Sequence, residues 1–175
     1  MIELKELKND DYEAYQEMYQ EFIQAKSDLI PDVLELPCET KLDYTNILEE
    51  LQRRRNGEHA DLDWYENAYY FLAWDNDIVV GIGCIRYNLT QKGYEIWGNI
   101  AYGVRPSERR KGYATQIAEK LIEKCASLNM KEVILCHYED NIISPKIFQK
   151  IGASYTNDAI STISDQKIKR YQILL

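Results

Sequence analysis

A basic run that ends in a glycine carries the clearest chemistry in this sequence of 175 residues. Arg105-Pro-Ser-Glu-Arg-Arg-Lys111 holds four positive charges and one negative charge, and Gly112 follows directly. A strand pattern precedes the run and a helix pattern follows it. The start of a helix presents free backbone N–H groups and a partial positive charge, which together bind phosphate. The small residues Gly112 and Ala114 let phosphate oxygens approach the backbone. We therefore expect a diphosphate site here, although it matches neither the Walker nor the dinucleotide fingerprint, and a solvated charged loop is the alternative.

Hydrophobic periodicity predicts the elements that position this loop. Strands are expected at residues 2–7, 68–74, 78–87, 96–104, 131–138, 153–161 and 167–175. Helices are expected at residues 12–23, 40–51, 117–128 and 144–151. Asn9 or Asp10 is expected to cap the first helix, and Thr40 with Asp43 the second. The order β-α-α-β-β-β-α-β-α-β-β is typical of an α/β or α+β fold around a mixed sheet. No repeat or linker divides the chain, so we expect one domain over residues 1–175.

Composition excludes several classes of protein. The formal net charge is −8, with 45% apolar and 29% charged residues, as in a soluble globular protein rather than a nucleic-acid-binding one. No apolar run is long enough to span a bilayer, and the start of the sequence shows no signal region, so we expect a cytoplasmic protein. Four cysteines stand apart from one another at positions 38, 84, 125 and 136. We interpret them as reduced core residues, and we expect no metal site.

Charge is divided unevenly along the chain. Residues 1–66 hold 18 acidic and 7 basic residues, a net charge of −11, whereas residues 67–175 hold 11 acidic and 14 basic residues, a net charge of +3. A basic loop in an otherwise acidic protein suggests that something anionic uses the loop.

Two motifs resemble the GNAT acyltransferases. Arg109-Arg-Lys-Gly112-Tyr-Ala114 resembles the family's acetyl-CoA loop, Arg/Gln-x-x-Gly-x-Gly/Ala. About thirty residues later, Asn141-Ile-Ile-Ser144 with Lys150-Ile-Gly152-Ala resembles the family's Asn-x-x-Ala/Ser…Lys-x-Gly-Phe segment. The resemblance covers residues 68–160 well and the first third only by element order. It implies a GNAT-like mixed central sheet of about seven strands flanked by about four helices.

The resemblance also implies direct acetyl transfer from acetyl-CoA to an amine in a ternary complex. The backbone N–H of Tyr102 takes the oxyanion role. The backbone from Arg109 to Thr115 holds the pyrophosphate, and Asn141 bonds the pantetheine arm. The implied coenzyme contacts are Tyr102, Val104, Arg109, Arg110, Lys111, Gly112, Tyr113, Ala114, Thr115, Asn141, Ser144 and Phe148. For Asn141 the alternative is a helix-capping asparagine.

The sequence departs from the family at two catalytic positions. Phe148 stands where many relatives have a tyrosine that protonates the leaving thiolate, which leaves Tyr138, Ser144 or solvent as the candidate acid. Gly98 stands where one branch has a glutamate base. An amine must lose a proton to attack, so a base is needed. Glu95 and Asn99 are the polar side chains nearest to Gly98 in the sequence and are candidates for that base. Glu139 and Asp140 are further candidates.

In this family the first two helices and the loop between them form a wall of the acceptor site. Because that part carries the net charge of −11, we expect a cationic acceptor, either a small amine or the basic end of a peptide, and the small, cationic amine is the main candidate. Candidate contributors are Asp28, Asp32, Glu35, Asp61, Asp63, Tyr65, Tyr69 and Tyr70. The expected partners are acetyl-CoA and this amine, with no nucleic acid and no membrane, and a homodimer is the candidate assembly. A non-catalytic acyl-CoA-binding sensor and an interaction module with an acidic partner are the alternatives.

Overall fold

The computed structural model describes residues 1–58 and 65–175, which form seven strands and five α-helices. The strands are β1 (Glu3–Glu6), β2 (Tyr65–Asp75), β3 (Ile78–Leu89), β4 (Ile100–Val104), β5 (Glu132–Tyr138), β6 (Ser154–Ile160) and β7 (Lys167–Leu174). The helices are α1 (Tyr12–Gln24), α2 (Lys41–Arg55), α3 (Gln91–Ile96), α4 (Tyr113–Ser127) and α5 (Ser144–Lys150). Short 3-10 turns cover Asn9–Asp11, Asp32–Glu35 and Pro106–Glu108. The predicted α/β fold is confirmed.

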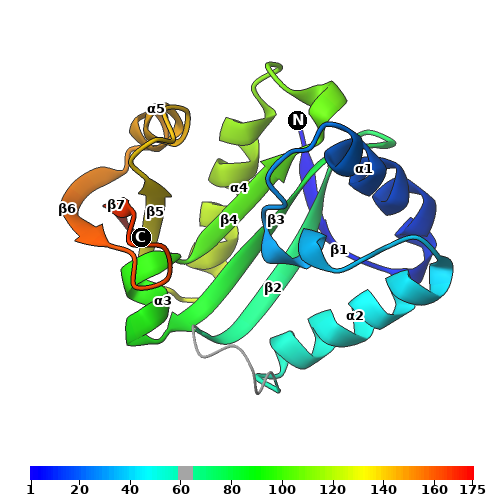
Figure 1. Ribbon diagram of the computed structural model, residues 1–175, viewed down its shortest axis with the longest axis horizontal. Helices are drawn as coiled ribbons and strands as arrows, with labels where there is room; N and C mark the ends of the chain where they lie inside the picture. Colours follow the sequence, from blue (N-terminus) through cyan, green and yellow to red (C-terminus); the bar gives the residue numbers. More distant parts are fainter. Residues whose placement is uncertain (59–64) are drawn as a thin grey trace.

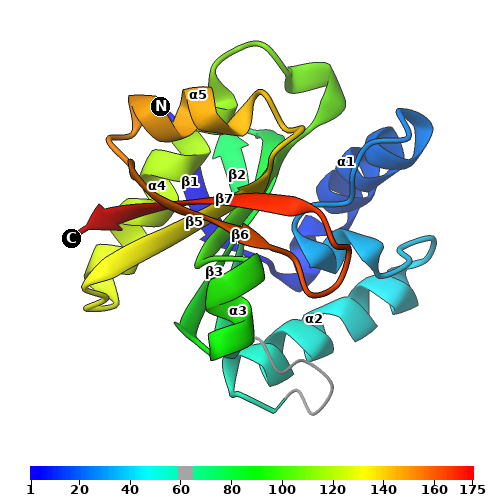
Figure 2. The ribbon, with the colours of Figure 1, turned by 60° about the vertical axis from the view of Figure 1, so that its left-hand side comes forward.

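The strands divide into two antiparallel sheets. One has the order β1-β2-β3-β4 and the other the order β5-β7-β6 (Figures 1 and 2). An isolated bridge between Gly98 and Leu135 joins them where β4 begins. The expected seven-stranded arrangement is therefore built as two sheets that meet at one place.

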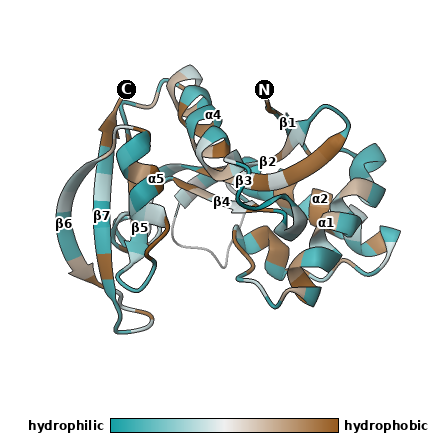
Figure 3. Ribbon diagram, turned by 90° about the horizontal axis from the view of Figure 1, so that it is seen from above, coloured by the Kyte–Doolittle hydropathy of each residue, from teal (hydrophilic) through white to brown (hydrophobic). Residues whose placement is uncertain are grey.

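Helices cover both faces of the four-stranded sheet. Seen from above, that sheet lies between α4 and the pair α1 and α2 (Figure 3). Alternate residues of β2 supply the two cores: Tyr70 and Leu72 pack with the α1 and α2 side chains, whereas Phe71 and Ala73 pack with α4. This alternation follows from the two-residue period of a strand.

The helical stripes predicted from the sequence are largely buried. Tyr15, Met18 and Phe22 of α1 are at most 1% exposed, but Ile23 is 43% exposed and lies outside the core. The capping box at the start of α2 is confirmed, because Thr40 Oγ1 accepts from Asp43 N at 3.2 Å. The predicted Asn9 or Asp10 cap is wrong: both residues lie inside a 3-10 turn that leads into α1.

The strand predicted over residues 96–104 is too long at its start. Its first residue, Ile96, is instead the last residue of α3, whose N-cap Thr90 accepts a hydrogen bond from Gly93 N at 3.3 Å. Gly98 has a φ of +70°, and a Cβ there would lie 2.5 Å from the Ile134 carbonyl oxygen. A glycine is required at this position, and β4 begins only after it. Within the described residues, no helix is long and apolar enough to cross a membrane.

Candidate active site

A cavity of about 250 Å³ opens between the two sheets. It is lined by the segment between α1 and α2, by β3 and β4, by the end of β5, and by α5. Five residues predicted for the coenzyme or for proton transfer line it together: Tyr102, Tyr138, Asn141, Ser144 and Phe148. The predicted acceptor residues Asp32 and Glu35 line it as well. Residues of β4, β5 and α5 therefore meet the segment between α1 and α2 in one place.

The cavity opens because the described parts of β4 and β5 are hydrogen-bonded to each other only near Asn99 and separate beyond it. Asn99 N donates to the Ile134 carbonyl at 2.7 Å, and Ile134 N donates to Asn99 Oδ1 at 2.7 Å. The same side chain donates from Nδ2 to the Arg86 carbonyl at 3.0 Å. Beyond this junction no ladder joins β4 to β5 in the described residues. Asn99 is thus a structural link between the sheets, and this role does not support Asn99 as a catalytic base.

The register of β4 turns part of its backbone toward the cavity. Arg86 N donates to the Asn99 carbonyl, and Arg105 N donates to the Val80 carbonyl, so these are hydrogen-bonded pairs. Bonding alternates along an antiparallel pair. Tyr102, opposite Gly83, therefore directs its N–H and C=O away from β3, and so does Val104. Both residues face the side on which the cavity opens.

The loop before α4 leaves a row of backbone donors unused. Gly112 has a φ of +86°, and a Cβ built there would meet nothing within 4 Å. None of the N–H groups of residues 110–115 donates to a protein acceptor in the described part of the chain. The N–H of Arg109 differs, because it donates to the Pro106 carbonyl at 3.4 Å. A helix N-terminus with open space above a glycine is suited to an anionic ligand.

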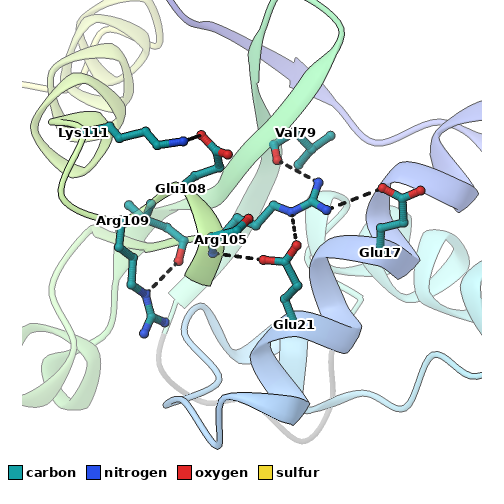
Figure 4. A network of polar contacts seen from close by, with 9 residues as sticks. Glu17, Glu21, Val79, Arg105, Glu108, Arg109 and Lys111 are labelled. Atoms are coloured by element: carbon teal, nitrogen blue, oxygen red, sulfur yellow. Dashed lines mark hydrogen bonds and ion pairs between the residues drawn. The ribbon is translucent and has the colours of Figure 1, made fainter.

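The basic side chains of the loop are mostly bonded within the protein (Figure 4). Arg105 Nε donates to Glu21 Oε1 at 2.8 Å, and Ser107 N donates to Glu21 Oε2 at 3.0 Å. Burial raises the pKa of Glu21, but these two bonds outweigh burial and hold the pKa below its ordinary value. Lys111 Nζ pairs with Glu108 at 2.8 Å. The acidic first part of the chain thus supplies some of the anions that the basic loop was expected to need.

Arg109 and Arg110 differ from these pairs. Arg109 Nη2 donates to Ser27 Oγ at 2.9 Å, its Nε donates to the Val104 carbonyl at 3.3 Å, and its guanidinium lies 5.7 Å from the Phe22 ring centre. Arg110, at a φ of +65°, has no polar side-chain partner among the described residues. Arg110 is therefore the basic side chain of this loop that is left for a ligand.

Two further residues that were predicted to contact the coenzyme form hydrogen bonds within the protein. Tyr113 donates its hydroxyl to Asp75 Oδ2 at 2.6 Å, and this bond raises the pKa of Tyr113 to about 12. Asn141 Oδ1 accepts from Ile143 N at 3.1 Å and from Ser144 N at 3.0 Å. Asn141 thus bonds the turn that leads into α5, although the N-cap position itself is Ile143. The Asn141 amide nitrogen faces no protein acceptor within the described residues. Ala114 and Thr115 lie in the first turn of α4.

The acidic candidates for the base do not come to the cavity. Glu95 lies on α3, where its carboxylate accepts from Gln91 Nε2 at 2.6 Å, and it does not line the cavity. Glu139 pairs with Lys167 at 3.1 Å and with Lys169 at 3.5 Å. Asp140 is exposed and also lies outside the lining.

His137 is a cavity residue that the sequence argument overlooked. Its Nδ1 lies 2.7 Å from the Tyr138 carbonyl oxygen. Because a carbonyl only accepts, Nδ1 carries the proton, and in the neutral ring Nε2 keeps a lone pair. Nε2 is buried without a hydrogen-bond partner in the described chain. The ring packs against Phe148 and Tyr171. A polar residue inside the apolar run 131–138 was the signal that could have identified it.

The acceptor wall contains a buried charge cluster. Asp32 lines the cavity, and its Oδ2 accepts from Arg54 Nη1 at 2.8 Å. The Tyr70 hydroxyl donates to Asp32 Oδ1 at 3.1 Å and accepts from Arg54 Nη1 at 2.7 Å. Arg86 is 3% exposed and lines the same cavity. Neither arginine was predicted from the sequence.

The remaining acceptor candidates are scattered. Glu35 is exposed at the rim of the cavity, whereas Asp28 is exposed outside the lining. Tyr65 is buried, and Tyr69 packs with the α4-side core. Asp61 and Asp63 fall outside the described residues. The Tyr102 side chain packs against the core on the α4 side, and burial raises the pKa of its phenol above the ordinary value, so the phenol stays neutral.

Comparison with known proteins agrees with this architecture. The uncharacterized N-acetyltransferase YfmK of Bacillus subtilis (strain 168) is 29% identical over 110 residues, which make up 59% of this chain and 70% of that protein. RimL, a ribosomal L7/L12 alpha-N-protein acetyltransferase solved in complex with coenzyme A, matches with a TM-score of 0.69 at 11% identity, over 99% of this chain and 94% of its own.

The spermidine/spermine N-acetyltransferase SpeG from Vibrio cholerae matches with a TM-score of 0.63 at 14% identity, over 99% of this chain and 95% of its own. These two likenesses show the fold. The family model described as acetyltransferase (GNAT) family matches residues 30–153, which is more than half of the chain. The chain therefore belongs to the GNAT acetyltransferase family and is an acyltransferase.

Proposed function

We propose that this protein binds acetyl-CoA and transfers its acetyl group directly to a small primary amine in the cavity. The observation that carries the proposal is the row of unused N–H donors at residues 110–115, at the end of the strand whose Tyr102 N–H faces the cavity. A ligand that uses both needs a phosphate at one end and a polarised carbonyl at the other. Acetyl-CoA has this build, and coenzyme A is bound in the solved structure of RimL.

The proposed coenzyme contacts begin at the phosphate end. The N–H groups of residues 110–115 hold the pyrophosphate, and Arg110 adds charge that no carboxylate of residues 1–58 or 65–175 neutralises. The Val104 backbone and the Asn141 amide nitrogen bond the pantetheine arm, which runs along Ser144 and Phe148. The Tyr102 N–H then bonds the thioester oxygen, where negative charge grows during attack.

The ammonium form of the acceptor first releases one proton to solvent, and a second proton then passes from nitrogen to sulfur. The amine nitrogen attacks the thioester carbonyl carbon, the carbon–sulfur bond breaks, and an amide forms. His137 replaces Glu95 as the proposed base, because its Nε2 lone pair is unbonded in a residue that lines the cavity. Tyr138, which lines the same cavity, is the proposed proton donor to the thiolate. Holding the two reactants together supplies much of the rate.

The proposed acceptor arrives as an ammonium cation. Glu35 at the rim and the acidic character of residues 1–66 favour the approach of a positive charge. The cavity, at about 250 Å³, suits a small acceptor. SpeG is a polyamine acetyltransferase by name and RimL a protein acetyltransferase, so the fold accommodates either kind of amine.

Ligand binding and turnover test the proposal separately. Acetyl-CoA is expected to raise the melting temperature, because it binds the folded state. Turnover is measured as thiol release that depends on an added amine. Binding without thiol release from any amine would instead identify the protein as an acyl-CoA sensor.

The variant Gly112→Asp places a carboxylate where the pyrophosphate is proposed to sit, and it is expected to abolish the acetyl-CoA shift. Gly152→Asp is the matched control, since Gly152 has a φ of +79° and also has nothing within 4 Å of a built Cβ. The control carries the same backbone strain away from the loop. If Gly112→Asp keeps the full acetyl-CoA shift, the proposed pyrophosphate site is wrong.

A further inference from the structure

We infer that the acceptor carries a carboxylate that binds Arg86, so that the substrate class is a small amino carboxylate rather than a simple alkylamine. The inference rests on the proposed function and adds a second recognised group to the acceptor. It is carried by one buried cation in the cavity wall whose hydrogen bonds are incomplete.

Arg86 is buried without the contacts that a buried cation normally has. Its side chain is 3% exposed. Nη1 lies 3.5 Å from the Gly98 carbonyl oxygen, Nη2 lies 3.7 Å from Asp32 Oδ1, and Nε has no partner in the described residues. Charge-assisted N–H···O bonds are normally shorter, about 2.7–2.9 Å. Since an arginine does not lose its proton, this charge stays in the wall of the cavity.

Asp32 forms a long ion pair with Arg86, at 3.7 Å, but it does not balance Arg86 alone, because the same carboxylate also pairs with Arg54. Oδ2 accepts from Arg54 at 2.8 Å, and Oδ1 accepts from the Tyr70 hydroxyl at 3.1 Å. Glu50 pairs with Arg54 at 2.9 Å and with Arg53 at 2.8 Å, so it belongs to the far side of the cluster. Within the part of the chain that the structure describes, no second carboxylate pairs with Arg86.

The open donors of Arg86 suit a carboxylate. A guanidinium presents paired N–H groups that match the two oxygens of a carboxylate, and the unbonded Nε leaves one such pair incomplete. The Trp97 ring lies 5.7 Å from the guanidinium and supports its plane. Glu35 lies at the rim of the same cavity and Arg86 lies in its wall. The cavity therefore offers an anionic residue to the ammonium and a cationic residue to the carboxylate of one small molecule.

Matched pairs of acceptors test the inference. Glycine is compared with methylamine and glycinamide, and 4-aminobutyrate with butylamine, each by amine-dependent thiol release. The wild type is expected to favour at least one amino carboxylate over its uncharged partner by about tenfold or more in kcat/KM, the effect of one charge-assisted contact. Equal rates within both sets would overturn the inference while leaving the acetyltransferase proposal intact.

The variant Arg86→Met separates recognition from folding. It is expected to remove the preference for the carboxylate, so that the ratio of kcat/KM values falls toward one. Its melting temperature is expected to rise, because an apolar side chain replaces a buried charge with incomplete bonds. Arg53→Met is the matched control, since Arg53 is 60% exposed on α2, and it should keep the preference. A retained preference in Arg86→Met would overturn the inference.

Binding of butyrate gives a readout that needs no turnover. Millimolar butyrate is expected to raise the melting temperature of the wild type and of Arg53→Met, but not of Arg86→Met. A shift of equal size in all three proteins, or in none, would contradict a carboxylate site at Arg86. Failure of acetyl-CoA to bind, with the butyrate shift intact, would overturn the proposed function and not the anion site.

Discussion

The loop after β4 and the wall of the cavity both contain basic side chains, but these side chains differ in how short their polar contacts are. In the loop, Arg105 is bonded to Glu21 at 2.8 Å and Lys111 to Glu108 at 2.8 Å. In the cavity, Arg86 has no contact as short as these. A charge with short contacts holds elements of the protein together. A buried charge without them is costly unless a ligand completes its bonds.

The largest expected effect comes from removing the carboxylate shared in the acceptor wall. Asp32→Asn leaves Arg54 and Arg86 as buried cations without the anion between them. We expect the free energy of unfolding to fall by about 3–5 kcal/mol, as for other broken buried ion pairs. Urea unfolding measures the change. Glu35→Gln, at the exposed rim, is the control and is expected to change stability by less than about 0.5 kcal/mol. A small loss for Asp32→Asn would contradict the prediction, because it would show that the ion pairs of the cavity wall stabilise the protein no more than those of the loop.

His137→Phe tests the cavity side of the comparison through catalysis. The phenyl ring keeps the packing against Phe148 and Tyr171 but has no lone pair. We expect kcat to fall about a hundredfold, the size of a lost general base, with an unchanged acetyl-CoA affinity. The melting temperature should change little, because the lost bond from Nδ1 to the Tyr138 carbonyl is offset by the removal of the unpartnered buried Nε2. Turnover within about twofold of the wild type would remove His137 from the mechanism.

Glu21→Gln tests the loop side of the comparison. The variant weakens the bonds from Arg105 and Ser107 that fix the loop to α1, and we expect a loss of roughly 1–2 kcal/mol of stability at pH 7. Acetyl-CoA affinity should also fall, because the loop that presents the donors is less fixed. Glu17→Gln is the control, since Glu17 is 67% exposed and lies 3.5 Å from Arg105.

The pH dependence of this effect has a defined sign. The pKa of Glu21 is lowered in the folded protein, so its stabilising effect is complete above the ordinary value of 4.5 and is lost as the pH falls through the folded value. The stability difference between wild type and Glu21→Gln should therefore shrink below pH 4.5. A difference that stays constant at lower pH would show that charge is not the cause.

The smallest expected effect concerns the four thiols. Burial raises the pKa of Cys38, Cys84 and Cys136 to about 11 and that of Cys125 to about 12. Since the thiolate is the reactive form, an aromatic disulfide reagent at pH 8 should label almost none of them in the folded protein and all of them in urea. Rapid labelling of Cys136 in the folded protein would show that the cavity is open to bulky molecules.

Local signals predicted the elements and the loop well. The apolar period of α4 and the glycine before it are contained in about fifteen residues, and the Thr40–Asp43 cap needs only four. The short helix α3 was missed because its six residues carry no apolar stripe, and because Gly98 was interpreted as part of a strand.

Contacts between distant segments could not be predicted in the same way. The pairing of Arg54 with Asp32 spans 22 residues, and its place beside Arg86 depends on how the segment after α1 crosses the sheet. No periodicity encodes that crossing. The gathering of Tyr102, Tyr138 and Asn141 around one cavity was predicted only through the resemblance to a family, because β4 and β5 lie far apart in the sequence.

The junction at Asn99 has a consequence for how such a molecule can change. One side chain bonds both sheets, through Oδ1 to Ile134 N and through Nδ2 to the Arg86 carbonyl. Asn99 therefore helps to set the distance between the two sheets, together with Arg170 of β7, which donates to the Tyr94 and Glu95 carbonyls of α3. A substitution of Asn99 would alter the spacing of all the groups between the two sheets at once, whereas a substitution of a single cavity-lining residue would alter one group. New acceptors can thus be accommodated by substitutions of single lining residues while the proposed coenzyme contacts stay unchanged.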